Sequence, residues 1–286
     1  MEIELYRYFA SHAFETLKDK MLMLARPSSL NDPFEFLYRS KGQITMAKAR
    51  RYIKSRMKSE YFYREIKRNN PAIKNKSDFK KFMRSEFENL SRKYFDDYDT
   101  ISTPDPLLCK IMAEKHFRLS CFTSTELLPH EEILMWSHYA AKHTGVRLKF
   151  RLNDSIKHPY LIKKVLYSKE RAGLDLTNTA EIQETQKTII ESVRTKAEGW
   201  SYEKEYRLFA QPSDCKDVKG DDGEVRSFIR FKPEIILQID FGINSPKREI
   251  ERITTLARSE YPHVQIRKAN YHKCDYALTY EEIYKA

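Results

Sequence analysis

Two kinds of segment follow one another along the chain, and their order restricts the fold. Apolar side chains recur at helical spacing between residues 45 and 98. The segments on either side of this stretch have the composition and alternation of β-strands, with uneven connections between them. Strands are expected at 3–9, 21–25, 117–123, 145–151, 163–167, 202–209, 228–231, 235–241 and 264–268, and further helices at 12–19, 107–115, 133–143, 180–197 and 246–261.

This order predicts an α+β protein in which a mixed sheet forms the core, because regular strand-helix alternation is missing. We assign residues 1–40 and 117–286 to the core domain and residues 41–116 to a helical, basic insertion. The polar sequence "SDCKDVKGDDGEV" at 213–225 is expected to be a flexible loop.

Positive charge is concentrated in the insertion. Between Lys41 and Arg84 there are fifteen Lys or Arg residues and three acids, a balance of +12, whereas the whole chain carries +11. The rest of the protein is therefore close to neutral, so the charge points to a local partner and not to a general requirement for solubility.

Composition excludes several classes of protein. No apolar run reaches the length of about 18 residues that a membrane span needs, and the N-terminus lacks the features of a secretion signal. The four cysteines, at 109, 121, 215 and 274, form no C-x-x-C pair, so neither a disulfide framework nor a structural zinc site is expected. Seven glycines and no G-x-G-x-x-G disfavour a dinucleotide fold of the Rossmann type. We expect a cytoplasmic protein without membrane contact.

Two acids stand close together in "WSYEKEYRL", at 200–208. If this segment is a strand, Glu203, Glu205 and Arg207 share one of its faces. Like charges at this spacing repel unless cations or a ligand compensate them. Glu203 and Glu205 are therefore candidate catalytic residues, and a structural network of ion pairs is the alternative.

Several sequence blocks resemble a bacterial family catalogued as domain of unknown function 2971. These blocks are "YRYF" at 6–9, "PSSLNDPFE" at 27–35, "LSCFTST" at 119–125, "MWSHYAAKHTGVRLKF" at 135–150, "VLYS" at 165–168 and "WSYEKEYRL" at 200–208. They occur in order over nearly the whole chain. The resemblance indicates kinship and carries no mechanism.

A second resemblance, to arginine-type ADP-ribosyltransferases, supplies a mechanism. Those enzymes have an Arg on the first strand, a Ser-Thr-Ser strand in the middle and a Glu-x-Glu element later. Arg7, the run Thr123, Ser124 and Thr125, and the pair Glu203 and Glu205 are similar in kind and order, with Thr-Ser-Thr in place of Ser-Thr-Ser.

This resemblance implies an ADP-ribosyltransferase-like sheet core that uses NAD as its substrate. Arg7 would bind the phosphates of NAD, and Ser124 with its neighbouring hydroxyls would support the ribose. Glu205 would stabilise the oxocarbenium-like transition state, while Glu203 would activate the acceptor. The alternatives are that Arg7 is a surface arginine and that residues 123–125 cap a following helix.

Other residues are candidates for contacts with NAD. Tyr8 adjoins Arg7, and Asn31 and Asp32 lie in a turn before a proline, where a ligand or a buried turn would both fit. His138 and Tyr139 offer flat rings for stacking, although such residues on a helix more often belong to the core. No metal site is expected, because His138 and His143 are five positions apart and face different sides of a helix.

The basic insertion predicts a nucleic-acid partner, bound through residues 41–84, since cations are interleaved there with aromatic residues. A solvated helix face, or a docking surface for an acidic antitoxin or regulator, is the alternative. The cations expected to contact nucleic acid are Arg50, Arg51, Lys54, Lys58, Arg64, Lys67 and Arg68.

Together these features suggest an NAD-dependent ADP-ribosyltransferase-like toxin or defence effector whose acceptor is RNA or DNA. A nucleic-acid-binding module without catalysis is the alternative from another class. A metal-dependent nuclease is less favoured, because further acids at suitable spacing are missing.

Overall fold

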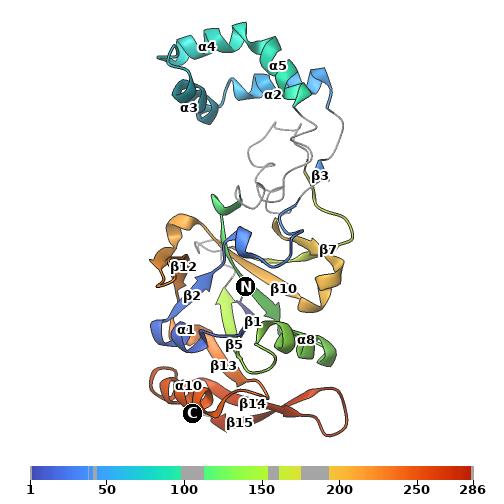
Figure 1. Ribbon diagram of the computed structural model, residues 1–286, viewed down its shortest axis with the longest axis vertical. Coiled ribbons are helices and arrows are strands. Elements are labelled where there is room, and N and C mark those ends of the chain that lie inside the picture. Colours follow the sequence, from blue (N-terminus) through green and yellow to red (C-terminus); the bar gives the residue numbers. More distant parts are fainter. Residues whose placement is uncertain are drawn as a thin grey trace. The chain divides into compact units, whose positions relative to one another are not determined.

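A computed structural model describes residues 2–37, 39–40, 44–97, 113–153, 161–174 and 193–284 of the chain (Figure 1). The chain divides into two compact units. The core unit comprises Met1–Pro33, Lys110–Lys169 and Lys196–Ala286, and the helical unit comprises Phe34–Cys109 and Glu170–Thr195. Residues 170–195, which the sequence assigned to the core domain, thus fall in the helical unit.

An eight-stranded mixed sheet forms the centre of the core unit, in the order β15-β14-β13-β5-β1-β4-β10-β6. Strands β13 and β14 pair in parallel, and the other neighbours pair antiparallel. The α+β class with a mixed sheet is therefore confirmed, while β15 was not expected. The strands are β1 (Glu2–Phe9), β4 (Arg118–Ser124), β5 (Val146–Asn153), β6 (Leu161–Lys164), β10 (Glu205–Ala210), β13 (Ile236–Phe241), β14 (Gln265–Tyr271) and β15 (Leu278–Tyr284).

A second, three-stranded sheet contains β11 (Lys216–Lys219), β12 (Val225–Arg230) and β2 (Met21–Leu24), in that order. The loop expected at 213–225 is thus wrong in part: β11 pairs with β12 from Lys216 opposite Phe228 to Lys219 opposite Val225. The polar composition of this segment is explained by its exposure to solvent, since all four residues of β11 are exposed. Gly223, at φ 82°, allows the tight turn between the two strands.

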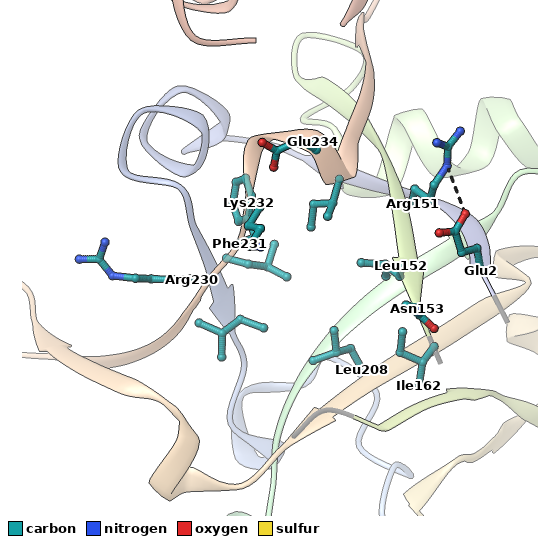
Figure 2. A pocket seen from close by; sticks show the side chains of 13 residues that line it. Glu2, Arg151, Leu152, Asn153, Ile162, Leu208, Arg230, Phe231, Lys232 and Glu234 are labelled. Atoms are coloured by element: carbon teal, nitrogen blue, oxygen red, sulfur yellow. Dashed lines mark ion pairs between the residues drawn. The ribbon is translucent and has the colours of Figure 1, made fainter. Parts of the chain in front are cut away.

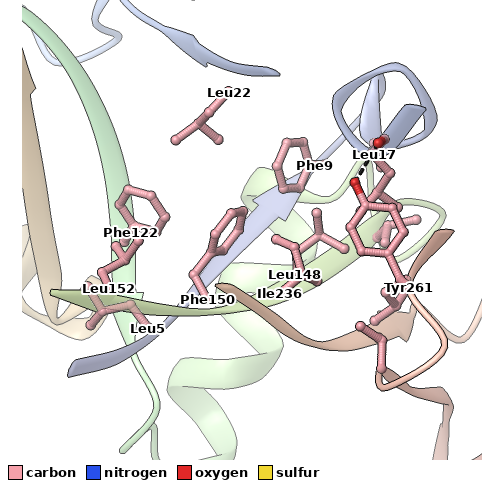
Figure 3. Packing of buried hydrophobic residues seen from close by; sticks show 14 of the residues in the cluster. Leu5, Phe9, Leu17, Leu22, Phe122, Leu148, Phe150, Leu152, Ile236 and Tyr261 are labelled. Carbon is pink, nitrogen blue, oxygen red and sulfur yellow. Dashed lines mark hydrogen bonds between the residues drawn. The ribbon is translucent and has the colours of Figure 1, made fainter. Parts of the chain in front are cut away.

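One face of the large sheet is apolar, and it holds the main hydrophobic core (Figure 3). Leu5 and Phe9 of β1 and Phe150 of β5 pack there beneath α1 (Ala13–Asp19) and α10 (Lys247–Glu260). The Tyr261 hydroxyl donates a hydrogen bond of 2.5 Å to the Leu17 carbonyl, which joins the ends of these two helices. Leu22 and Ile229 from the three-stranded sheet complete the cluster.

Helix α8 (Pro129–Tyr139) packs on the opposite face, where Met135, Trp136 and Ala140 surround Tyr8. The helix predicted at 133–143 is therefore displaced. It begins earlier because Pro129 occupies its first turn and the Glu131 carboxylate accepts the Leu128 N–H at 2.7 Å. It ends earlier because the backbone turns left-handed from 141 to 143, at φ 46°, 55° and 66°.

Buried charges lie on this second face, where they are linked by hydrogen bonds and ion pairs. The Arg147 guanidinium donates to Asp240 Oδ2 at 2.9 and 2.7 Å, and to the Tyr8 hydroxyl at 3.2 Å. It also lies 3.9 Å from the centre of the Tyr6 ring. Arg267 donates to the other oxygen of Asp240 at 2.8 Å. These contacts link β1, β5, β13 and β14 through side chains as well as through the backbone.

Four helices lie within the helical unit between residues 45 and 98. Thr45, Ser59 and Asn75 accept N-terminal N–H groups of α2, α3 and α4, which explains where these helices begin. Their apolar faces enclose Ile53, Ile73, Phe79 and Met83. The helices are α2 (Met46–Arg56), α3 (Glu60–Asn69), α4 (Lys76–Ser85) and α5 (Phe87–Asp96), and the unit also holds the short parallel strands β3 (Arg39–Ser40) and β8 (Gly173–Leu174).

Two other predicted helices fall largely outside the described residues, namely 107–112 of the segment 107–115 and 180–192 of the segment 180–197. The end of the second segment is described and is a strand, β9 (Thr195–Ala197), which pairs with β7 (Leu166–Ser168). A 3₁₀ helix, η2 (Glu198–Glu203), follows β9 and leads into β10. The other short 3₁₀ helices are η1 (Pro27–Ser29), η3 (Pro212–Asp214) and η4 (Pro233–Ile235). None of the helices in the described ranges is both long and apolar enough to cross a membrane.

Candidate functional site

Two buried carboxylates lie at the entry to strand β10. The strand expected from residue 202 begins only at Glu205, because η2 continues to Glu203 and Lys204 then adopts a left-handed conformation, at φ 43°. Both acids are nevertheless 3% exposed and bind the same cation. Their proximity was predicted from strand alternation, whereas a 3₁₀ helix followed by one left-handed residue produces it.

The shared cation is Lys196, which the sequence analysis did not select. Its Nζ atom lies 2.6 Å from Glu203 Oε2 and 3.1 Å from Glu205 Oε2. The ammonium also lies 5.0 Å from the centre of the Trp200 ring. Lys196 belongs to β9, and the helical pattern predicted over 180–197 gave no reason to place it beside the acids. The only available signal was that Lys196 is the cation nearest to "WSYEKEYRL" on its N-terminal side.

Arg207 binds Glu205 from the same strand face. Its Nε donates to Glu205 Oε1 at 2.7 Å and its Nη2 to Oε2 at 3.2 Å, so the ion pair is bidentate. Burial alone would raise the pKa of Glu205, but the charges of Arg207 and Lys196 outweigh it and lower this pKa to about 2. Glu205 is therefore ionised at neutral pH.

The environment of Glu203 raises the pKa of its carboxyl group, whereas that of Glu205 is lowered. Burial raises the pKa of Glu203 to about 7, and the negative charge of Glu205 adds to this shift, while Lys196 opposes it. The Tyr139 hydroxyl donates a hydrogen bond to Glu203 Oε1. Two adjacent acids thus differ in protonation near neutral pH, which is the arrangement that acid–base catalysis by a carboxylate pair requires.

Some of the predicted NAD contacts do gather around the acid pair. Tyr139 binds Glu203 directly, and a hydrogen bond from the Asn31 side chain reaches Tyr139. Burial raises the pKa of Tyr139, and the neighbouring Glu203 charge raises it further, so the phenol stays protonated. His138 is exposed, and its ring centre lies 6.4 Å from that of Tyr139 and 6.2 Å from that of Tyr202. Together these side chains form the outer part of the site.

Arg7 does not lie near these side chains, because it is on the other face of the sheet. Glu205 lies opposite Thr123, and Thr123 lies opposite Tyr6, so these three side chains share one face of the sheet. Arg7 follows Tyr6 and projects from the other face. There its guanidinium donates to the Met23 carbonyl at 3.0 and 3.1 Å and to the Ser120 hydroxyl. The sheet therefore separates the predicted phosphate ligand from the acids.

The sheet also separates the hydroxyl residues Thr123 and Ser124, which lie on different faces. Thr123 is buried on the face of Glu205, whereas Ser124 lies opposite Leu5 and belongs to the face of Arg7. Thr125 follows the end of β4. The Ser124 hydroxyl accepts the N–H of Glu126 at 3.2 Å, and α8 begins only at Pro129, so the run does not supply a helix cap.

Tyr8 and Asp32 are both buried, and their surroundings indicate a structural role. Tyr8 projects beside Arg147 and packs edge-on against Trp136, with ring centres 5.3 Å apart. Asp32 is 2% exposed, which agrees with the buried turn that was the alternative interpretation of "NDPF". Among the described residues there is no group of three or more His, Cys, Asp or Glu placed to hold a metal ion.

The cations predicted to bind nucleic acid are exposed on the helical unit. Arg50 binds Glu88, with Nη2 to Oε2 at 2.9 Å, and Arg64 lies 3.6 Å from Glu60. The other exposed cations of the predicted set are Arg51, Lys54, Lys58, Lys67 and Arg68.

The aromatic side chains near these cations have another role than the expected base stacking. Tyr52 stacks on Tyr94 with ring centres 4.1 Å apart, and Phe62 and Tyr63 pack edge-on against Phe79. These rings belong to the core of the helical unit. The side chain of Tyr61 lies outside the described part of the structure.

Among the pockets formed by described residues, two open on the apolar side of the core unit, away from the acids. One has a volume of about 580 Å³ (Figure 2). Leu152, Ile162 and Leu208 lie on its floor, and Arg151 and Glu2, which form an ion pair of 4.0 Å, lie at its edge. The other, of about 640 Å³, includes Arg7 in its lining.

A family model described as a protein of unknown function (DUF2971) matches residues 135–208. The matched segment includes Tyr139, Lys196, Glu203, Glu205 and Arg207, so it covers the acid pair and both of its cations. The match supports the resemblance found in the sequence to this family. No curated protein and no solved structure matches the chain.

Proposed function

We propose that the protein is an ADP-ribosyltransferase-like enzyme that acts on NAD at the acid pair. The observation that carries this proposal is the binding of Glu203 and Glu205 to one buried ammonium, with their pKa values shifted in opposite directions. A pair of titratable groups driven apart in this way is typical of sites where one acid stays charged while the other exchanges a proton.

In this proposal Glu205 stabilises the transition state through its negative charge. Its carboxylate, held by Arg207 and Lys196, would face the positive charge that develops on the ribose when the bond from C1′ to nicotinamide breaks. Glu203 would take the proton of the acceptor hydroxyl as the new bond from C1′ to the acceptor oxygen forms. Nicotinamide leaves with the bonding electron pair, so the step needs no oxidant or reductant. Tyr139 would keep the Glu203 carboxylate oriented through its hydrogen bond.

The proposal rests on the acids and not on Arg7, which lies on the other face of the sheet. Asn31, His138 and Tyr202, which lie around Tyr139 and one another, would contact the nicotinamide ribose from the outer part of the site. The favoured acceptor is nucleic acid, and modification of RNA or DNA at the expense of NAD would be the action of a toxin or a defence effector.

The test is release of free nicotinamide from NAD, measured with and without RNA or DNA. The wild type should release nicotinamide, and Glu203→Gln should lower the rate by at least about tenfold. Glu198→Gln is the matched control, because Glu198 is an exposed acid of the same 3₁₀ helix and forms an ion pair of 3.8 Å with Lys169. Equal rates in the wild type and Glu203→Gln, or no nicotinamide release by a folded wild type, would contradict the proposal.

A second candidate function is nucleic-acid binding without catalysis, and the exposed cations of the helical unit favour it. In that case the acids, Lys196 and Arg207 would only form a structural charge network. Binding of RNA or DNA that falls with salt, without nicotinamide release, would support this function. Strand cleavage that a chelator abolishes would instead support a nuclease, and binding of only an acidic protein would assign the basic surface to an antitoxin or regulator.

A further inference from the structure

The pocket that includes Arg7 lies between elements that are distant in sequence. It has a volume of about 640 Å³, within the range of roughly 300–1,000 Å³ that small-molecule sites occupy. Its lining comes from β1, α1, β2 and the hairpin of β11 and β12, all in the core unit. Phe9, Met21, Met23 and Phe228 give the pocket an apolar wall.

Arg7 is a cation without a counter-ion in this pocket. Within the described ranges no carboxylate forms an ion pair with it, and its hydrogen-bond acceptors are the Met23 carbonyl and the Ser120 hydroxyl. Burial lowers the pKa of Arg7 to about 10, because water is removed and no carboxylate compensates the charge. Arg7 is partly buried, and a charge that is partly removed from water destabilises a protein unless an anion or hydrogen bonds compensate it.

The geometry of the guanidinium leaves room for such an anion. Of its five N–H groups, the described residues accept hydrogen bonds from both on Nη1 and from one on Nη2. The remaining groups, on Nε and Nη2, share one edge of the planar guanidinium. This is an edge that a carboxylate can accept bidentately.

Acids from other elements line the same pocket. Glu15 binds Arg252 at 3.2 Å, and Asp222 binds Arg226, so these two are already compensated. Asp19, at the end of α1, and Asp221, in the hairpin, form no ion pair with any residue of the described segments. The pocket therefore combines an anion-binding edge at Arg7 with acids that would repel a second negative charge and attract a positive one.

We propose that this pocket binds a small zwitterion with an apolar body, of the amino-acid class. Its carboxylate lies on the Nε–Nη2 edge of Arg7, its ammonium group is directed toward Asp19 and Asp221, and its side chain packs against Phe9 and Phe228. The inference is independent of the proposed function, since the pocket and the acid pair lie on opposite faces of the sheet.

Titration calorimetry with L-phenylalanine and L-leucine tests the inference. Two analogues separate the charges: 3-phenylpropionate keeps the carboxylate, and 2-phenylethylamine keeps the ammonium group. The wild type should bind at least one of the two amino acids, and phenylalanine at least about tenfold more tightly than either analogue, since each analogue loses one charged contact. The proposal would be overturned if neither amino acid showed saturable binding up to millimolar concentration.

Substitutions of the residues that line the pocket test whether the ligand binds there. Arg7→Met should abolish binding, and Arg7→Lys should weaken it, because lysine keeps the charge but loses the bidentate edge. Asp221→Asn changes an exposed residue and should leave the fold intact while it weakens phenylalanine binding, with little effect on 3-phenylpropionate. Phenylalanine binding that is unchanged in Asp221→Asn and in Asp19→Asn would also overturn the proposal, even if Arg7→Met fails to fold.

Discussion

The side chains of Arg7 and Glu205 project from opposite faces of the eight-stranded sheet, although β4 alone lies between their strands. The period of two along each strand fixes this relationship, because Glu205, Thr123 and Tyr6 are aligned in register and Arg7 follows Tyr6. Arg7 therefore cannot act on a ligand held by Glu205 without a change of register. The acid pair and the Arg7 pocket have to be tested as separate sites.

Glu203→Gln should change the pH dependence of stability. The pKa of Glu203 is raised in the folded state to about 7, so the folded state of the wild type binds this proton more tightly than the unfolded state does. This contribution is complete below the unfolded pKa, near 4.3, and it is lost as pH rises toward 7. Relative to the wild type, the glutamine variant should gain up to about 3 kcal/mol in the free energy of unfolding between pH 4.5 and pH 8.

Urea denaturation of both proteins at several pH values measures this difference. Glu198→Gln, at an exposed position, should show the same pH dependence as the wild type. A difference between wild type and Glu203→Gln that does not vary with pH would show that Glu203 titrates normally.

Lys196→Met should destabilise the core unit strongly. The ammonium binds both acids inside the protein, and among the described residues its removal leaves Arg207 as the one cation paired with the two buried carboxylates. Losing one partner of a buried ion pair costs about 3–5 kcal/mol. The loss should be smaller in the double variant Lys196→Met, Glu203→Gln, because only one buried negative charge then remains. Denaturation curves of the single and double variants at pH 8 measure both, and equal stability of the two would contradict the shared-cation arrangement.

Asp240→Asn should likewise destabilise the core unit, by about 3 kcal/mol or more. Asp240 is fully buried and compensates Arg147 and Arg267, at 2.7 and 2.8 Å, so the amide leaves two guanidinium groups without their common anion. Glu4→Gln is the control, because its ion pairs with Lys149 and Arg151 are more exposed and should contribute about 1 kcal/mol or less. Thermal unfolding compares the two variants, and similar losses in both would contradict the prediction.

If the helical unit binds nucleic acid, the salt dependence of binding should depend on its exposed cations. Replacement of Arg64, Lys67 and Arg68 by Gln should reduce the slope of log K against log salt by about 2–3, since each phosphate contact contributes about 0.7–0.9. Arg50→Gln should have a smaller effect than any one of these changes, because Glu88 already compensates Arg50 bidentately. Fluorescence anisotropy with a labelled duplex and a labelled single strand measures the slopes. An unchanged slope in the triple variant would place the binding surface elsewhere.

Local patterns predicted parts of the site and the fold correctly. The alternation in "EKEYR" brought Glu205 and Arg207 to one face, and the helical spacing between 45 and 98 corresponds to α2 to α5. Local patterns failed where packing determines the outcome. Tyr52, Phe62 and Tyr63 were interpreted as stacking groups because their positions among cations are visible in the sequence, whereas their burial against Phe79 and Tyr94 is not.

The sequence by itself determined the class of fold, the position of the basic helices and the presence of two adjacent acids, because each follows from residues close together in the chain. Only the tertiary structure decided which cation the acids share and which face of the sheet Arg7 occupies. Those relationships depend on strand register and on β9, whose pairing joins segments far apart in sequence. A shift of register by one residue reverses the face of every side chain on a strand, so no local pattern could fix them.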